Sequence, residues 1–163
     1  ARGGKLARPG YYWLAYAWAN LLLSCHECNG KQHKGNLFPL EEGSTRAADH
    51  RAELSAERPS FVDPATEEPA DYLRFRQHVP YAVRAGSRGE RTIDGFGLRR
   101  APLQSQRRTT YDRLDALLLI ARTHPDASLR SRAKTALLRS AEAPAPFSAM
   151  ARDFLVAREF NAG

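Results

Sequence analysis

The feature that most constrains this chain is a pair of cysteines, three residues apart, that follows a short apolar run. Residues 20–34 read Asn-Leu-Leu-Leu-Ser-Cys-His-Glu-Cys-Asn-Gly-Lys-Gln-His-Lys, and Cys25 and Cys28 are the two cysteines of the chain. This spacing lets two thiolates turn toward one tetrahedral ion, as in zinc knuckles. We therefore expect Cys25 and Cys28 to bind a structural zinc. A pair of ordinary buried cysteines and a redox pair are the alternatives.

A structural zinc takes four ligands, so the cysteine pair is half of a site. The other two ligands are expected from residues before Ala1 or from histidines. The chain starts with Ala1 and not with Met, and its opening residues 1–10 resemble an exposed basic loop. We expect the natural protein to carry residues before this point.

Asn29 and His33 follow the cysteines with helical spacing. A separation of four residues places two side chains on one helix face, one turn apart. An amide oxygen and an imidazole could hold one divalent ion with open positions, as hydrolysis of a phosphodiester requires. Mg²⁺ or Mn²⁺ suits such ligands. A solvent-facing polar pair is the alternative.

The residues around the cysteines predict a strand and a helix. Leu21 to Leu23 form a short apolar run, which predicts a buried strand. A helix is expected to begin near Cys25 to Cys28 and to run to about Lys34, where Gly35 ends it. Asn20, just before the strand, is expected to hydrogen-bond across a turn and to orient its neighbours.

The charge of the chain favours a polyanionic partner. The 25 Lys and Arg residues exceed the 18 Asp and Glu residues, which gives a formal net charge of +7. Most of the basic residues are arginines, whose planar forks of donors suit phosphate. A well-solvated surface is the alternative. The sequence shows neither an apolar run long enough to span a bilayer nor a secretory signal, and we expect a cytoplasmic protein.

The chain divides into three regions, which we expect to pack as one compact domain. Residues 1–40 hold the cysteine motif, with a helix over Tyr11 to Trp18 whose residues Tyr12, Trp13 and Tyr16 pack in the core. Residues 41–100 are predicted to be extended and rich in loops. Residues 101–163 are predicted to be helical.

Local patterns refine the second and third regions. Loose alternation over 72–79 predicts a strand that pairs with 81–83, before a turn at 86–89. Apolar residues at three- and four-residue spacing predict a helix from Pro102 to a break at His124 to Asp126. Further helices are predicted over 128–140 and 148–160, the last with Ser148 as its N-cap.

Taken together, these motifs resemble the HNH endonuclease family. Asn20-Leu21 is similar to the central Asn of that family, and Cys25-x-x-Cys28-Asn29 is similar to its third element, with Asn29 where many members have His. His33 matches a second helical ligand. Lys31 and Lys34 fall where basic residues of the family approach phosphate.

The resemblance is closest to HNH proteins associated with retrons and the Septu anti-phage system. The residues that carry it include Tyr11 to Tyr16, Phe38-Pro39-Leu40, Glu57-Arg58-Pro59, Val62-Asp63-Pro64, Thr92-Ile93, Gly97-Leu98 and Arg107. In that pattern an Asn-Arg pair follows Gly-Leu, whereas this chain has Arg99-Arg100.

The resemblance implies an α+β fold with a ββα-metal (HNH, zinc-knuckle-like) motif at the N-terminal end and a mainly α-helical remainder. It implies a metal-dependent endonuclease that hydrolyses DNA, with Asn29 and His33 as ligands of the catalytic ion and Asn20 as an orienting residue. Lys31 and Lys34 would contact nucleic acid. It also implies a partner ATPase that docks on the helices after Pro102.

The chain departs from the family pattern at its start. Members place a Cys-x-x-Cys and a Glu/Asp-His-x-x-Pro motif before this region, and that His is the general base that activates water. Here His26, His50, His78 and His124 are interpreted as surface or structural residues. A non-catalytic zinc-knuckle module that binds nucleic acid or protein is therefore a second hypothesis. A fragment that is inactive without its first strand is the third.

Overall fold

The computed structural model of the protein describes residues 10–160, so the predicted basic loop at 1–10 lies almost wholly outside the described part. The described helices and strands are, in chain order, α1 (His26–Asn29), β1 (Leu73–Arg76), β2 (Val79–Ala82), α2 (Arg88–Gly95), α3 (Ala101–Thr123), α4 (Ala127–Ala141) and α5 (Ser148–Ala157). Four single 3-10 turns occur at Tyr12–Leu14, Trp18–Asn20, Leu54–Ala56 and Pro69–Asp71. The mixture of helix and a small sheet confirms an α+β class in its coarse form.

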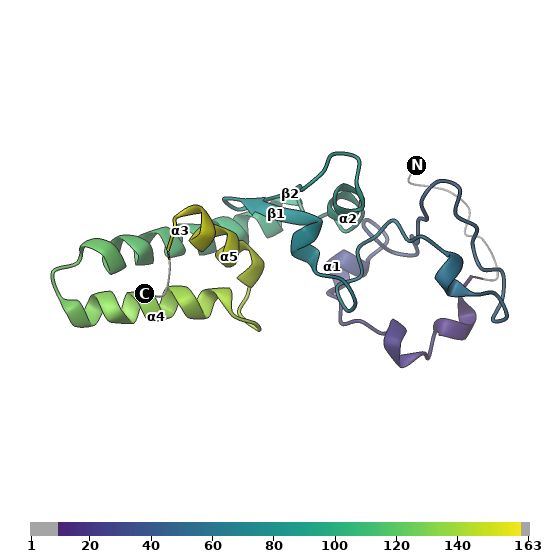
Figure 1. Ribbon diagram of the computed structural model, residues 1–163, viewed down its shortest axis with the longest axis horizontal. Helices are drawn as coiled ribbons and strands as arrows, with labels where there is room; N and C mark the ends of the chain where they lie inside the picture. The colour runs from purple at the N-terminus through teal and green to yellow at the C-terminus, as the bar shows by residue number, and fades with distance from the viewer. Residues whose placement is uncertain (1–9, 161–163) are drawn as a thin grey trace.

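The hydrophobic core lies among the last three helices. In Figure 1, α3 and α4 run side by side as an antiparallel pair, and α5 packs against both. Their apolar residues recur every three or four positions and so meet on one face of each helix. The core consists of Leu114, Leu118, Ala121, Ala133, Leu137, Met150, Ala151, Phe154 and Leu155. No described helix is long and apolar enough to cross a membrane.

The sheet is an antiparallel hairpin of two short strands. β1 pairs with β2 in the register Leu73 to Ala82 and Arg76 to Val79. α5 covers the free edge of β1, because the carboxylate of Asp153 accepts the Phe75 N–H at 2.7 Å and pairs with Arg74 at 2.9 Å. α2 lies against β2. A strand edge that is capped in this way is protected from pairing with another chain.

The sequence prediction was accurate for this C-terminal half, with three corrections of detail. The three helices and their break at His124 to Asp126 are confirmed, and two strands do pair, but the first ends at Arg76 and Val79 already belongs to the second. The turn expected at 86–89 lies at 85–86, and residues 88–89 are the first two of α2. Ser148 is the first residue of α5 and not its N-cap, because Phe147 holds that position with a left-handed φ of 58°.

The N-terminal segment, residues 10–60, contains little regular structure. Figure 1 shows it as a series of loops at the end of the molecule away from the paired helices α3 and α4. One isolated bridge joins Leu40 to Pro59. The buried strand predicted at 21–23 is wrong: these leucines are extended but form no strand, and Leu21, Leu22 and Leu23 are 52%, 52% and 106% exposed. A strand needs a partner for its backbone groups, and the described residues provide none here.

The helix predicted over Tyr11 to Trp18 is also wrong. The segment forms two separate 3-10 turns, and Tyr16 and Trp18 are 96% and 87% exposed. The aromatic packing in this segment centres instead on Tyr11. Its ring packs edge-to-face against Trp13 and Phe38, with 5.6 and 5.9 Å between ring centres. The ββα-metal arrangement is not confirmed, because the hairpin of the described residues follows α1 in the chain and contacts α2 and α5.

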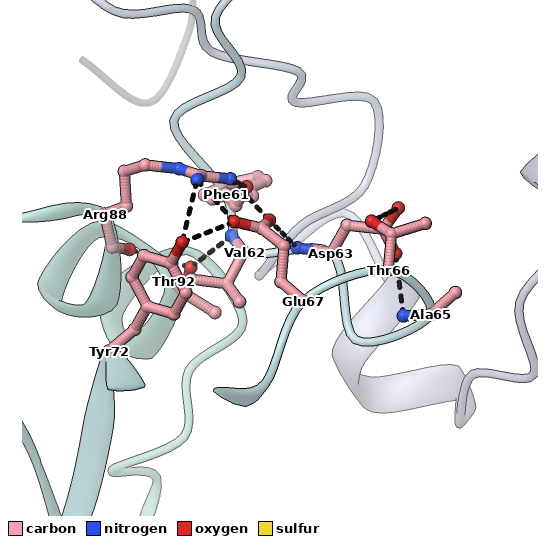
Figure 2. Close-up of polar contacts among 9 residues, drawn as sticks. All are labelled: Phe61, Val62, Asp63, Ala65, Thr66, Glu67, Tyr72, Arg88 and Thr92. Atoms are coloured by element: carbon pink, nitrogen blue, oxygen red, sulfur yellow. Dashed lines mark hydrogen bonds and ion pairs between the residues drawn. The ribbon is translucent and has the colours of Figure 1, made fainter. Parts of the chain in front are cut away.

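A partly buried ion-pair network fixes the segment after residue 60 against α2 (Figure 2). Arg88 forms a two-pronged pair with Glu67, at 2.7 Å on each carboxylate oxygen, and donates to the Phe61 carbonyl. Tyr72 donates its hydroxyl to Glu67 at 2.6 Å. Thr92 of α2 accepts the Val62 N–H at 2.9 Å. Because Glu67 collects donors from several segments, it anchors this junction.

We expect the Glu67 carboxylate to make folding stability depend on pH. Its hydrogen bond with Arg88 lowers the pKa of Glu67 from 4.5 to about 2, against a smaller opposing effect of burial. A depressed pKa stabilises the fold above pH 4.5, and this contribution is lost as pH falls toward 2. Urea denaturation should show the wild type losing about 1–2 kcal/mol between pH 6 and pH 3 through this group. Glu67→Gln should be less stable at pH 6 and lack this part of the decline; an unchanged pH profile would contradict the assignment.

Candidate functional site

Cys25 and Cys28 lie together at the start of α1. Cys25 is the N-cap, and its sulfur accepts the Cys28 backbone N–H at 3.4 Å. This cap satisfies a backbone donor that the first helical turn leaves free. Both cysteines are free thiols; Cys25 is exposed and Cys28 is half-buried. The sequence prediction that the pair shares one small region is therefore consistent with the structure, and zinc binding by it stays a prediction.

Arg100 extends from the loop between α2 and α3 to both sulfurs. Its Nη1 lies 3.6 Å from Cys28 Sγ and its Nη2 lies 4.0 Å from Cys25 Sγ. The same guanidinium also donates to the carbonyls of Phe96 and Gly97. Arg100 thus connects the N-terminal segment to the helical half of the protein through the cysteine pair.

The two thiols differ in their electrostatic environment. The backbone N–H of Cys28 lowers the pKa of Cys25, and Arg100 adds to this effect. Burial raises the pKa of Cys28, although Arg100 acts in the opposite direction. Cys25 is therefore the sulfur that carries negative charge more readily, and a cation already stands beside it.

Cys25 borders an open depression of about 520 Å³. Its walls mix polar and apolar surface and come from residues 24–32, including Cys25, Glu27, Asn29 and Lys31. Asn29 and Lys31 are both exposed here. The structure thus brings together one predicted zinc ligand, one predicted catalytic ligand and one predicted phosphate contact.

His33 does not share a helix face with Asn29, which corrects the prediction. α1 ends at Asn29, because Gly30 turns to an extended backbone with a ψ of 163°. His33 sits in the following turn, and its ring packs against Gly97, where an added Cβ would lie 2.9 Å from the ring carbon Cγ. Its Nδ1 is buried without a hydrogen-bond partner. If His33 binds a metal, the ligand atom is therefore its other ring nitrogen, Nε2.

Asn20 lies in a different hollow. Its side-chain amide donates to the Leu14 carbonyl at 3.1 Å, which closes the turn before it. It lines a small apolar cavity of about 180 Å³ with Tyr11, Phe38 and Glu57. Asn20 therefore organises the N-terminal loops and is not among the residues that line the depression beside the cysteines. Its orienting role in catalysis stays a prediction.

Lys34 is turned away from solvent. Its Nζ lies 3.8 Å from the centre of the Phe38 ring, in a cation–π contact. Burial lowers the pKa of Lys34. Of the two lysines predicted to contact nucleic acid, Lys31 is thus the one that the structure leaves exposed.

The donors present fit the two predicted metals unequally. The described residues contain no group of three or more His, Cys, Asp or Glu side chains that could hold an ion. The two thiols supply half of a tetrahedral zinc site, so the described residues do not complete it. The amide oxygen and the imidazole nitrogen of Asn29 and His33 have the donor chemistry that Mg²⁺ or Mn²⁺ accepts alongside water.

Two arginines near the cysteines were not identified as site residues from the sequence. Arg100 contacts sulfurs 72 and 75 positions earlier in the chain. Arg107 of α3 is 4% exposed and donates to the Leu98 carbonyl at 2.6 Å. Its burial, and secondarily Arg100, lower the pKa of Arg107 to about 10. The sequence offered two signals: Arg107 is among the residues that carry the resemblance, and Arg99-Arg100 stands where the resembled family differs.

Comparison with known proteins connects the chain to one curated relative. It is 40% identical over 103 residues to the Septu protein PtuB of Bacillus mycoides (strain KBAB4). The match covers 63% of this chain and 34% of that protein, so this chain spans about a third of the length of the relative. No family model matches the chain, and no solved structure matches it. The similarity supports a relationship to Septu proteins.

Proposed function

We propose that this chain is part of a metal-dependent HNH endonuclease that hydrolyses DNA phosphodiester bonds in anti-phage defence. The observation that carries the proposal is the depression beside α1, where the Cys25 thiol, Asn29 and Lys31 meet. The 40% identity to a Septu protein supports the defence context. The activity of the whole relative enters only as part of this proposal.

Each residue of the site has a stated part in the proposal. Asn29 and, through Nε2, His33 would hold the divalent ion, which when bound supplies positive charge to the scissile phosphate. Lys31 would bind a neighbouring backbone phosphate without reading sequence. Gly97 packs closely against the ring of His33 and so helps to hold it in position. Asn20 fixes the loop before the cysteines through the Leu14 carbonyl.

A partner ATPase belongs to the same proposal. The three C-terminal helices expose apolar side chains that the core does not use, among them Leu119 at 63% and Val156 at 68%. Large exposed apolar side chains are the kind that a surface in contact with protein contains. We propose that this end of the α3–α5 unit faces the ATPase.

A non-catalytic zinc-knuckle module is the second candidate. Arg100 lies beside both cysteine sulfurs, where a cation fits a structural rather than a catalytic role for the pair. The described residues also place no imidazole in the walls of the depression except that of His26. A module of this kind would bind nucleic acid or protein and would leave the phosphodiester intact.

Nicking of supercoiled plasmid separates the two candidates. With Mg²⁺ or Mn²⁺, alone and with the candidate ATPase, the protein should convert supercoiled DNA to nicked circles, and EDTA should abolish the conversion. Asn29→Ala should slow nicking about 10- to 100-fold, because it removes a ligand of the ion. DNA binding without nicking under every metal condition would favour the zinc-knuckle module and reject the enzyme.

A further inference from the structure

A second basic feature lies far from the cysteines, in a groove between α3 and α4. The groove has a volume of about 500 Å³ and opens to solvent. Three arginines line it: Arg113 from α3, and Arg132 and Arg139 from α4. Neither the site described above nor the hydrophobic core uses these side chains.

The local sequence explains why a groove forms there. Arg132 and Arg139 are seven residues apart and so lie on the same side of α4, about 10 Å apart along the axis. The lining residues between them, Thr135 and Ala136, are short, so the floor stays low while the arginines form the walls. Leu137 points the other way into the core, where it is 0% exposed.

The positive charge of the groove is not compensated within the described residues. Arg113, Arg132 and Arg139 form no ion pair and no side-chain hydrogen bond in residues 10–160, although other arginines do. α4 carries four basic residues and no acidic one between Ala127 and Ala141. Asp115 of the facing helix is paired with Arg158 at 3.0 Å.

We propose that this groove binds the phosphate backbone of duplex DNA, as a second contact outside the cleavage site. The inference rests on the proposed function, and it adds to that function a surface for holding the substrate. Three guanidinium groups around a shallow channel suit phosphate oxygens. Measured along the duplex axis, the span from Arg132 to Arg139 equals about three base-pair steps of ~3.4 Å each.

The lining of the groove favours duplex DNA over other polyanions. It contains no aromatic side chain on which an unpaired base could stack, so single strands have no platform. It also offers no large apolar side chain of the kind that anchors protein partners. Charge contacts to a backbone need neither feature, and they give binding that is independent of sequence.

The test measures the affinity of the chain for a short labelled duplex in EDTA by fluorescence anisotropy over a salt series. The triple variant R113Q/R132Q/R139Q should bind at least about tenfold more weakly at low salt, and its log–log salt dependence should be shallower by about 2–3. The matched control removes the same charge at three exposed arginines without side-chain partners in the described residues, as R51Q/R84Q/R108Q. This control should stay within about threefold of the wild type.

Three results would contradict the proposal that the groove binds duplex DNA. One is equal weakening by the control variant, which would show only a general effect of net charge. Another is unchanged binding by the groove variant. The third is displacement of the duplex by polyglutamate at equal charge, which would indicate an acidic protein partner. The nuclease proposal is tested separately. If the wild type binds DNA but does not nick it in Mg²⁺ or Mn²⁺, the nuclease proposal is rejected and the proposal that the groove binds DNA is unaffected.

Discussion

Gly89→Ala is expected to destabilise the fold by about 3 kcal/mol, which is at the upper end for overpacking a buried position. Gly89 lies in the first turn of α2 and is buried against the backbone of Tyr72. An added Cβ would overlap the Tyr72 carbonyl oxygen and lie 2.8 Å from its carbon. That carbonyl cannot move aside freely, because it accepts the Val83 N–H at 2.9 Å. Relief of the clash would therefore disturb the start of α2 or the bond that continues the hairpin.

Thermal and urea unfolding of Gly89→Ala and Gly86→Ala measure this effect. Gly86 has a φ of +68° and nothing within 4 Å of an added Cβ, so its variant carries backbone strain without a clash. We expect Gly86→Ala to lower the free energy of unfolding by about 1 kcal/mol. For Gly89→Ala the midpoint should fall by about 6–12 °C. Equal losses in the two variants would show that α2 does not depend on this close approach.

Arg107→Ala is expected to lower the free energy of unfolding by about 3 kcal/mol, and Arg107→Met is expected to lower it by about 1 kcal/mol. The guanidinium lies between two rings, 5.3 Å from the centre of Phe75 and 5.8 Å from that of Phe147. It also donates to the Leu98 carbonyl, while its Nε is buried without a partner. Arg107 thus joins β1, the turn before α5 and the loop before α3.

The difference between the two Arg107 variants separates packing from charge. Alanine removes the stem as well as the charge and leaves a cavity between the rings. Methionine fills that space and escapes the cost of keeping a cation buried, so only the Leu98 carbonyl loses a partner. Urea denaturation of the three proteins measures both costs. If Arg107→Met were as unstable as Arg107→Ala, the charge and not the packing of Arg107 would hold this junction.

The sequence predictions were correct where a hydrophobic pattern extends over many residues and wrong where it is short. α3 and α4 span 23 and 15 residues, and their apolar residues recur over several turns, so the pattern alone places them. α1 has a single turn, and Gly30 stops it four residues before the predicted end. The run from Leu21 to Leu23 matches a strand locally, but a strand also requires a partner, which no local pattern reports.

The place of the cysteine pair was predictable from the sequence, whereas the contacts around it were not. The spacing of Cys25 and Cys28 was enough to place them together at the start of a helix. The approach of Arg100 to their sulfurs and of Gly97 to the ring of His33 joins residues more than 60 positions apart. Such contacts depend on how the loop before α3 folds back, and a single sequence carries no direct signal for them.

The measurement that most directly tests the account is the rate of plasmid nicking by the wild type and by His33→Ala, at DNA concentrations that saturate both. His33→Ala should nick about 100-fold more slowly, with an affinity for DNA in EDTA within about threefold of the wild type. His50→Ala, which changes an exposed histidine in a loop, should nick at the wild-type rate. Nicking by His33→Ala at the wild-type rate, or wild-type nicking that persists in EDTA, would contradict the proposed metal-dependent site.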